Sequence, residues 1–111
     1  QDPDNYNLLK NTLLFQIDFK KYEAAAKLSS EGLEIFPAQP LLYLLNGVAN
    51  NGLQKSEAAI ESLEIGLDFI LEDPKMERDF YEQLSLAHRT KGDAQKAKMY
   101  ADKATAIILP N

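Results

Sequence analysis

Residues 21–37 read KYEAAAKLSSEGLEIFP, and this stretch decides the fold because its pattern returns twice along the chain. The two copies are KSEAAIESLEIGLDF at 55–69 and DAQKAKMYADKATAI at 93–107. Three alanines anchor the alignment at intervals of 34 and 38 residues, namely Ala25, Ala59 and Ala97. A second small residue follows each anchor after seven positions: Gly32, Gly66 and Ala104. Recurrence at a period of about 20–50 residues is typical of repeat proteins.

Seven residues make about two helical turns, so the two small residues of each copy share one helix face. A narrow seam of small side chains lets a second helix approach closely, and bulky neighbours such as Leu28, Ile35 and Phe69 are expected to fill the surrounding space. Each copy is therefore predicted to be an amphipathic helix of about 14–16 residues. A further apolar-periodic segment precedes each copy, at roughly 5–18, 40–52 and 74–91. Their length and their Ala, Leu, Glu and Lys content favour helices over strands.

Helix-ending and helix-starting residues separate these six segments. Asp73-Pro74 is typical of a helix start, with aspartate capping free amides and proline in the first turn. Pro37 and Pro40 bracket one break, and glycine turns at Asn51-Gly52 and 91–93 mark two others. Gly47 stands inside a predicted helix, where glycine costs about 1 kcal/mol relative to alanine. We expect a neighbouring helix to press against it.

The pattern resembles the tetratricopeptide repeat (TPR) family, which repeats every 34 residues as two antiparallel helices. Repeats are placed at about 6–39, 40–73 and 78–111, with four additional residues at 74–77 read as an extended helix start. The matching positions are Tyr22, Ala25, Gly32 and Pro37, then Tyr43, Gly47, Ala59 and Gly66, then Tyr81, Leu84, Gly92, Ala97, Ala104 and Pro110. The resemblance implies an all-α, right-handed α-solenoid of three helix-turn-helix repeats, six helices in one domain over 1–111. Residues 1–5 resemble the closing turn of a preceding repeat, which predicts a chain taken from a longer array.

In proteins of this family the first helices of successive repeats line a concave groove. Carried over, the resemblance implies a partner-binding groove lined by Lys10, Leu14, Ile17, Leu41, Leu44, Leu45, Val48, Asn51, Glu82, Leu86 and Arg89. One subgroup grips the C-terminal carboxylate of chaperone tails with lysine, asparagine and arginine, and only Lys10 matches that set. Leu14 and Leu45 replace the asparagines, so we predict no carboxylate clamp. Asn46, Asn50 and Asn51 are either peptide-binding amides or turn and cap residues.

The composition excludes several kinds of function. The chain has 111 residues, a net charge of −5, one histidine and no cysteine. The negative charge argues against nucleic acid as the main ligand, and no run reaches the roughly 18 apolar residues of a membrane span. His88 has no histidine or cysteine partner, which favours a structural or surface histidine over a catalytic or metal-binding one. The acidic residues between Glu61 and Asp73 are read as a solvated face.

The sequence therefore predicts a protein that is not an enzyme, needs no metal or cofactor, and binds a protein or peptide. The apolar middle of the groove is predicted to take an amphipathic helix or an extended apolar peptide. The alternative is a structural spacer or packing module within a larger protein or assembly, with the groove filled by an adjoining helix or a second copy. Exposed faces of the terminal repeats would also permit self-association, and residues 107–109 form an apolar patch there.

Overall fold

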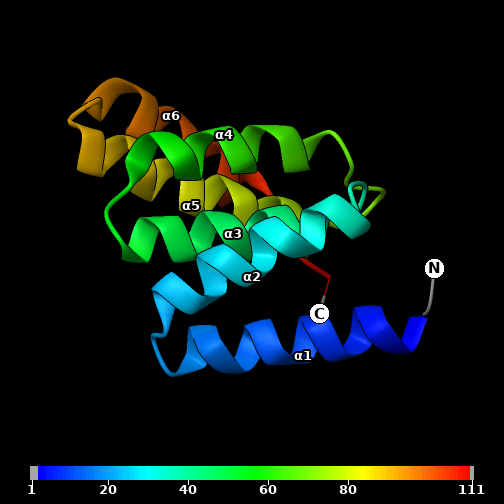
Figure 1. The fold of residues 1–111 in the computed structure, drawn as a ribbon. Coiled ribbons are helices and arrows are strands. Elements are labelled where there is room, and N and C mark those ends of the chain that lie inside the picture. The colour runs from blue at the N-terminus through cyan, green and yellow to red at the C-terminus, as the bar shows by residue number, and fades with distance from the viewer. Residues whose placement is uncertain (1–2, 111) are drawn as a thin grey trace.

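A computed structural model describes residues 3–110, and within them the chain forms six α-helices and no β-strand (Figure 1). In chain order they are α1 (Pro3–Asp18), α2 (Tyr22–Ile35), α3 (Pro40–Gly52), α4 (Ser56–Leu67), α5 (Pro74–Lys91) and α6 (Ala94–Ala106). The predicted all-α class is confirmed. Helices α4 and α6 have 12 and 13 residues, so both are shorter than predicted.

Local capping explains where the later helices begin. The carboxylate of Asp73 accepts a hydrogen bond from the Met76 amide at 3.0 Å, and Pro74 occupies the first turn of α5. Asp93 caps α6 in the same way through the Lys96 amide at 3.0 Å. Between them Gly92 adopts φ = +92°, a left-handed conformation that glycine enters at little cost. The residues at 74–77 extend the start of α5, as predicted.

The start of the chain differs from its prediction. The closing turn predicted at 1–5 falls partly on residues 1 and 2, which lie outside the described residues. Residues 3–5 belong to α1 instead of a turn. Helix α1 ends at Asp18, and the chain reverses through Lys20 at φ = +58°. Three residues, 19–21, thus connect α1 to α2.

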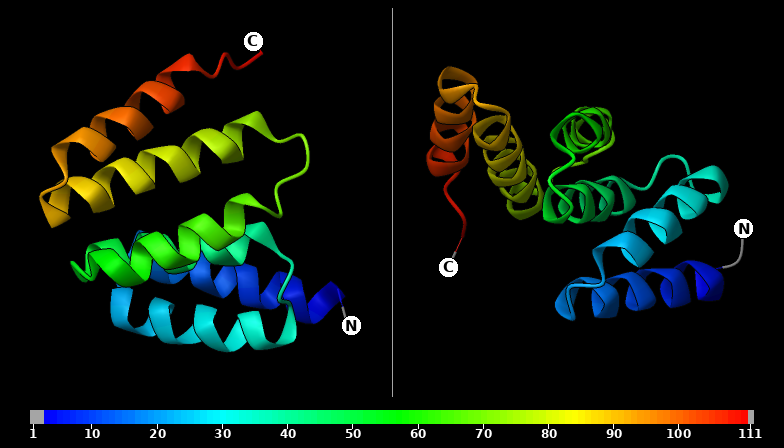
Figure 2. Two further views of the ribbon diagram at one scale, coloured as in Figure 1. Left: turned by 90° about the horizontal axis from the view of Figure 1, so that it is seen from above. Right: turned by 60° about the vertical axis from the view of Figure 1, so that its left-hand side comes forward.

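Each helix packs on the next in the chain, and α3 packs additionally on both α1 and α5. Figure 2 shows the resulting order, in which the α1–α2, α3–α4 and α5–α6 pairs follow one another across the molecule. Two hydrophobic clusters hold the pairs together. One joins Leu13 and Ala25 to Leu42 and Ala49, and the other joins Leu44 and Leu63 to residues of α5. Helix α3 is therefore shared between both halves of the core.

Small residues sit at the helix contacts, as predicted. Ala25 and Ala59 are fully buried and Ala97 is 6% exposed. A Cβ placed on Gly47 would lie 2.5 Å from Leu63 Cδ2, so Leu63 would have to move to admit a side chain there, which confirms the expected close approach. Of the bulky neighbours expected around these contacts, Ile35 and Phe69 remain 55% and 37% exposed. Phe69 nonetheless contacts the adjacent helix, because its ring stacks on that of Tyr43 of α3 with 5.7 Å between the centroids.

Candidate functional site

The predicted groove residues fall into three groups. Lys10, Ile17, Leu41, Val48 and Asn51 are half-buried, Leu14 and Leu86 are 40% and 39% exposed, and Glu82 and Arg89 are exposed. Helical spacing places the α1 set, the α3 set and the α5 set each on one side of its helix. Since α3 packs on α1 and α5, these three stripes run along neighbouring helices.

Leu44 and Leu45 belong to the core and offer almost no surface to a partner. They are 7% and 5% exposed, and each enters a different hydrophobic cluster. Leu44 packs with Leu63 and Phe80, whereas Leu45 packs with Leu13 and Ala25. The groove implied by the family resemblance therefore does not include Leu44 and Leu45, because other helices cover α3 on both sides. Leu41 and Val48 remain partly exposed on α3.

Polar groups lie beside the apolar residues of the predicted groove that remain partly exposed. The Asn51 Nδ2 donates to the backbone oxygen and Oε1 of Gln83, at 3.1 and 2.9 Å, and so ties α3 to α5. Glu82 forms an ion pair with Arg78 at 3.7 Å, and Arg89 lies 3.5 Å from the Ser85 hydroxyl. Glu82 and Arg89 also line a small polar cleft of about 200 Å³ between α5 and α6. Glu82 and Arg89 therefore already have interaction partners within the protein.

Asn46 and Asn50 of α3 have a role that differs from both predicted roles, which were peptide binding and the capping of turns and helices. Asn46 Nδ2 donates to the hydroxyls of Ser29 at 2.9 Å and Ser30 at 3.2 Å on α2. Its Oδ1 accepts from Asn50 at 3.0 Å and from the Ser62 hydroxyl on α4. Asn46 and Asn50 are only 5% and 8% exposed. Their amides therefore bridge α2, α3 and α4 inside the protein and are not available to a peptide.

His88 is a core residue, in agreement with the structural role predicted for it. Its ring is 3% exposed and stacks on Tyr100 at 5.5 Å between centroids, with 11° between the ring planes. Among the described residues neither ring nitrogen has a hydrogen-bond partner. Burial, together with the carboxylate charge of Glu64, raises the pKa of the Tyr100 phenol. Burial and then the charge and hydrogen bond of Glu77 raise the pKa of Tyr81, which also stacks on Tyr100.

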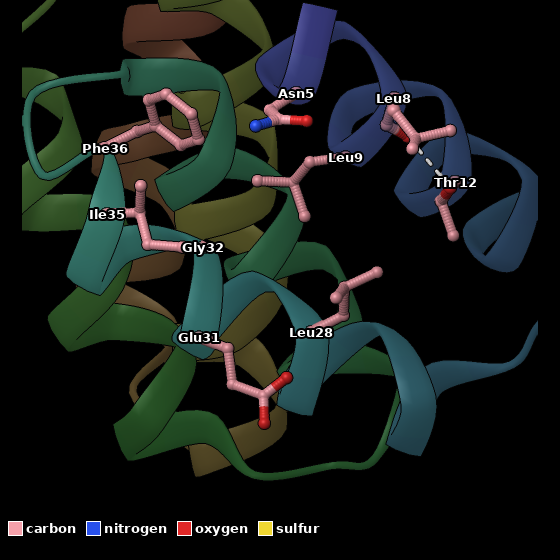
Figure 3. A pocket seen from close by; sticks show the side chains of 9 residues that line it. All are labelled: Asn5, Leu8, Leu9, Thr12, Leu28, Glu31, Gly32, Ile35 and Phe36. Carbon is pink, nitrogen blue, oxygen red and sulfur yellow. Dashed lines mark hydrogen bonds between the residues drawn. The ribbon is translucent and has the colours of Figure 1, made fainter. Parts of the chain in front are cut away.

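A second candidate surface was missed by the sequence analysis. An apolar cleft of about 650 Å³ opens between α1 and α2 (Figure 3), and its walls are Leu8, Leu9, Thr12, Leu28, Ile35 and neighbouring residues. Leu8 is 68% exposed, and Phe15 on α1 and Phe19 just after its end are 59% and 61% exposed. The spacing of residues 8, 12, 15 and 19 was the available signal, since it marks one side of a helix.

Two further properties of the described residues bear on the kind of site. Within residues 3–110, no three or more His, Cys, Asp or Glu side chains are grouped so as to hold a metal ion. In the same residues no helix combines the length and apolar character required to cross a bilayer. The acidic residues Glu61, Glu64, Asp68, Glu72 and Asp73 are all exposed, as a solvated run requires. Only Glu61 and Glu64 lie on a helix, α4, whereas Asp73 caps α5, so the run does not form one helix face.

No protein-family model matches the sequence, no curated protein matches it, and no solved structure matches the fold.

Proposed function

We propose that this protein is a non-catalytic interaction module of the TPR type, a right-handed α-solenoid whose first helices bind a protein segment. The binding face is formed by the stripes Lys10–Leu14–Ile17 on α1, Leu41–Val48 on α3 and Leu86 on α5. The observation that carries the proposal is the position of α3. It packs on both α1 and α5, yet keeps Leu41 and Val48 partly exposed between them.

The chemistry of this face suits an amphipathic helix or an apolar extended segment. Its middle is aliphatic, while Lys10 stands at one edge and Glu82 and Arg89 stand at the other. Such an arrangement of apolar anchors with a polar rim is the usual anatomy of a peptide-binding groove. Reactive groups are scarce, because the sequence has no cysteine and its one histidine is buried against Tyr100. That scarcity supports a binding role over a catalytic one.

The test is selection of ligands from a displayed library of random helical and extended peptides. Peptides enriched on the native protein should bind at least about tenfold more weakly to Val48→Asp or Leu86→Asp, because a carboxylate would have to be buried in an apolar contact. Leu71→Asp is the matched control, since Leu71 is 87% exposed and lies between α4 and α5. Failure to enrich any peptide, or equal binding to all variants, would contradict the proposal.

A further inference from the structure

Helix α3 contains two asparagines that are each followed directly by glycine, at 46–47 and at 51–52. An asparagine in this position can deamidate spontaneously, and a following glycine favours the reaction because it has no side chain to block the approach. The backbone nitrogen of the glycine forms a bond to Cγ of the asparagine, the Cγ–Nδ2 bond breaks, and the amide group takes the proton of that nitrogen and leaves as ammonia. Water then opens one C–N bond of the succinimide ring and leaves aspartate or isoaspartate.

A helical backbone protects asparagine against this reaction. It holds Cγ away from the next backbone nitrogen, and it engages the N–H of that nitrogen in a hydrogen bond to the carbonyl four residues earlier. The helix must therefore open locally before the ring can close. When opening and closing are fast relative to the chemistry, the rate follows the population of the opened state. The two sites should consequently differ by the free energy needed to open each of them.

The site at 46–47 lies in the middle of α3 and is held from several sides. Asn46 is 5% exposed, and its side chain bonds to Ser29 on α2 and to Ser62 on α4. Gly47 is buried against Leu63, since a Cβ on this glycine would lie 2.5 Å from Leu63 Cδ2. Opening α3 at this point would separate it from both neighbouring helices, which amounts to unfolding the core.

The site at 51–52 forms the last two residues of α3, and helix ends open most easily. Asn51 is half-buried and Gly52 is exposed. Opening the helix here breaks the two hydrogen bonds from Asn51 to Gln83 and the turn bonds at 53–55. It also separates Gly52 from the Tyr22 ring. None of these residues belongs to either hydrophobic cluster, so the core stays closed while Asn51 becomes reactive.

We propose that Asn51 is a deamidation site of the folded protein, and that its conversion to aspartate or isoaspartate loosens the contact between α3 and α5. In the unmodified protein Asn51 Nδ2 donates to the backbone oxygen of Gln83 at 3.1 Å and to Oε1 at 2.9 Å. A carboxylate at this position has no hydrogen to donate. The side-chain amide of Gln83 can rotate and donate to the carboxylate, whereas the backbone oxygen then faces a negative charge. This modification does not depend on the proposed binding function.

Peptide mapping by mass spectrometry tests the site. The native protein is incubated at mildly alkaline pH, digested with trypsin and analysed by electron-transfer fragmentation, which separates the two sites within the single tryptic peptide 28–55. Asn51 should deamidate at least about tenfold faster than Asn46 in the folded protein, which corresponds to about 1.4 kcal/mol in opening free energy. In the urea-unfolded protein the two rates should be closely similar, because each asparagine then precedes an unconstrained glycine.

Three results would overturn the proposed site. The first is an equal rate at Asn51 and Asn46 in the folded protein. The second is no reaction at Asn51 during a period that converts the unfolded protein completely. The third is an equal rate at Asn11, which is exposed on α1 and precedes Thr12 instead of glycine.

The variant Asn51→Asp imitates the aspartate product and tests the effect on α3 and α5. Its folding equilibrium constant, measured by urea unfolding, should be at least about fivefold lower than that of the native protein. It should also be lower than that of Asn51→Ala, which loses the same hydrogen bonds without placing a charge beside the Gln83 oxygen. Asn11→Asp adds the same charge at an exposed helix position and should stay within about twofold of the native value. An Asn51→Asp variant as stable as the native protein, or as Asn51→Ala, would overturn the loosened contact.

Discussion

Substitution of Asn46 by alanine should be among the most damaging single changes to this protein. The side chain is 5% exposed and connects three helices. Its removal takes the acceptor from the Ser62 hydroxyl and one amide contact from Ser29 at 2.9 Å. Ser29 keeps the Ala25 carbonyl at 2.7 Å and Asn50 keeps the Asn46 backbone oxygen at 2.9 Å, whereas the half-buried Ser62 hydroxyl loses the acceptor that Asn46 provides. A buried polar group without a partner costs about 1–3 kcal/mol, and each lost hydrogen bond about 0.5–1.5 kcal/mol. We expect Asn46→Ala to lower the free energy of unfolding by about 2–4 kcal/mol.

Urea unfolding followed by far-UV circular dichroism measures this loss. The matched control is Asn7→Ala on α1, where the asparagine is exposed; there the change should stay within about 0.5 kcal/mol. The double variant N46A/S62A should lose about 1 kcal/mol less than the sum of the two single variants, because the second substitution removes the stranded hydroxyl. A loss below about 1 kcal/mol for Asn46→Ala, or strict additivity with Ser62→Ala, would refute the reasoning.

Three other predictions concern stability. Gly66→Ala should destabilise the protein by about 1–3 kcal/mol in urea unfolding, because the new Cβ would lie 2.5 Å from Tyr43 Cβ. Alanine is the better helix former, so a stabilised variant would contradict this close approach. Asp93→Ala should lower stability by about 1 kcal/mol through loss of the α6 cap, measured as a lower thermal midpoint, and an unchanged midpoint would argue against the cap. Because burial raises the pKa of Tyr81 and Tyr100, the native state keeps these protons to higher pH than the unfolded chain does. The stabilisation that the two phenols contribute to the folded state is therefore complete below about pH 10 and is lost as the pH rises further. Above this pH the urea midpoint should fall less steeply in the double variant Y81F/Y100F than in the native protein. An equally steep fall would exclude these phenols as its cause.

The sequence was sufficient to predict features that depend on local chemistry. Asp73 and Pro74 indicate a helix start wherever they occur, and the structure uses them in that way. The small residues Ala25 and Ala59 were predictable as contact points, because a seam of small side chains recurs at a fixed interval. Gly47 could be interpreted for the same reason, since glycine inside a helix needs a neighbour to compensate its cost.

The binding face was harder to predict, because α3 is apolar on nearly every side. Leu41, Leu42, Leu44 and Leu45 follow one another closely, and hydrophobic periodicity cannot choose a single face in such a helix. The choice is made by helices from distant parts of the chain, which enclose Leu44 from one side and Leu45 from the other. The role of Asn46 was out of reach for a similar reason. Its hydrogen-bond partners on α2 and α4 lie 16 or more residues away along the chain.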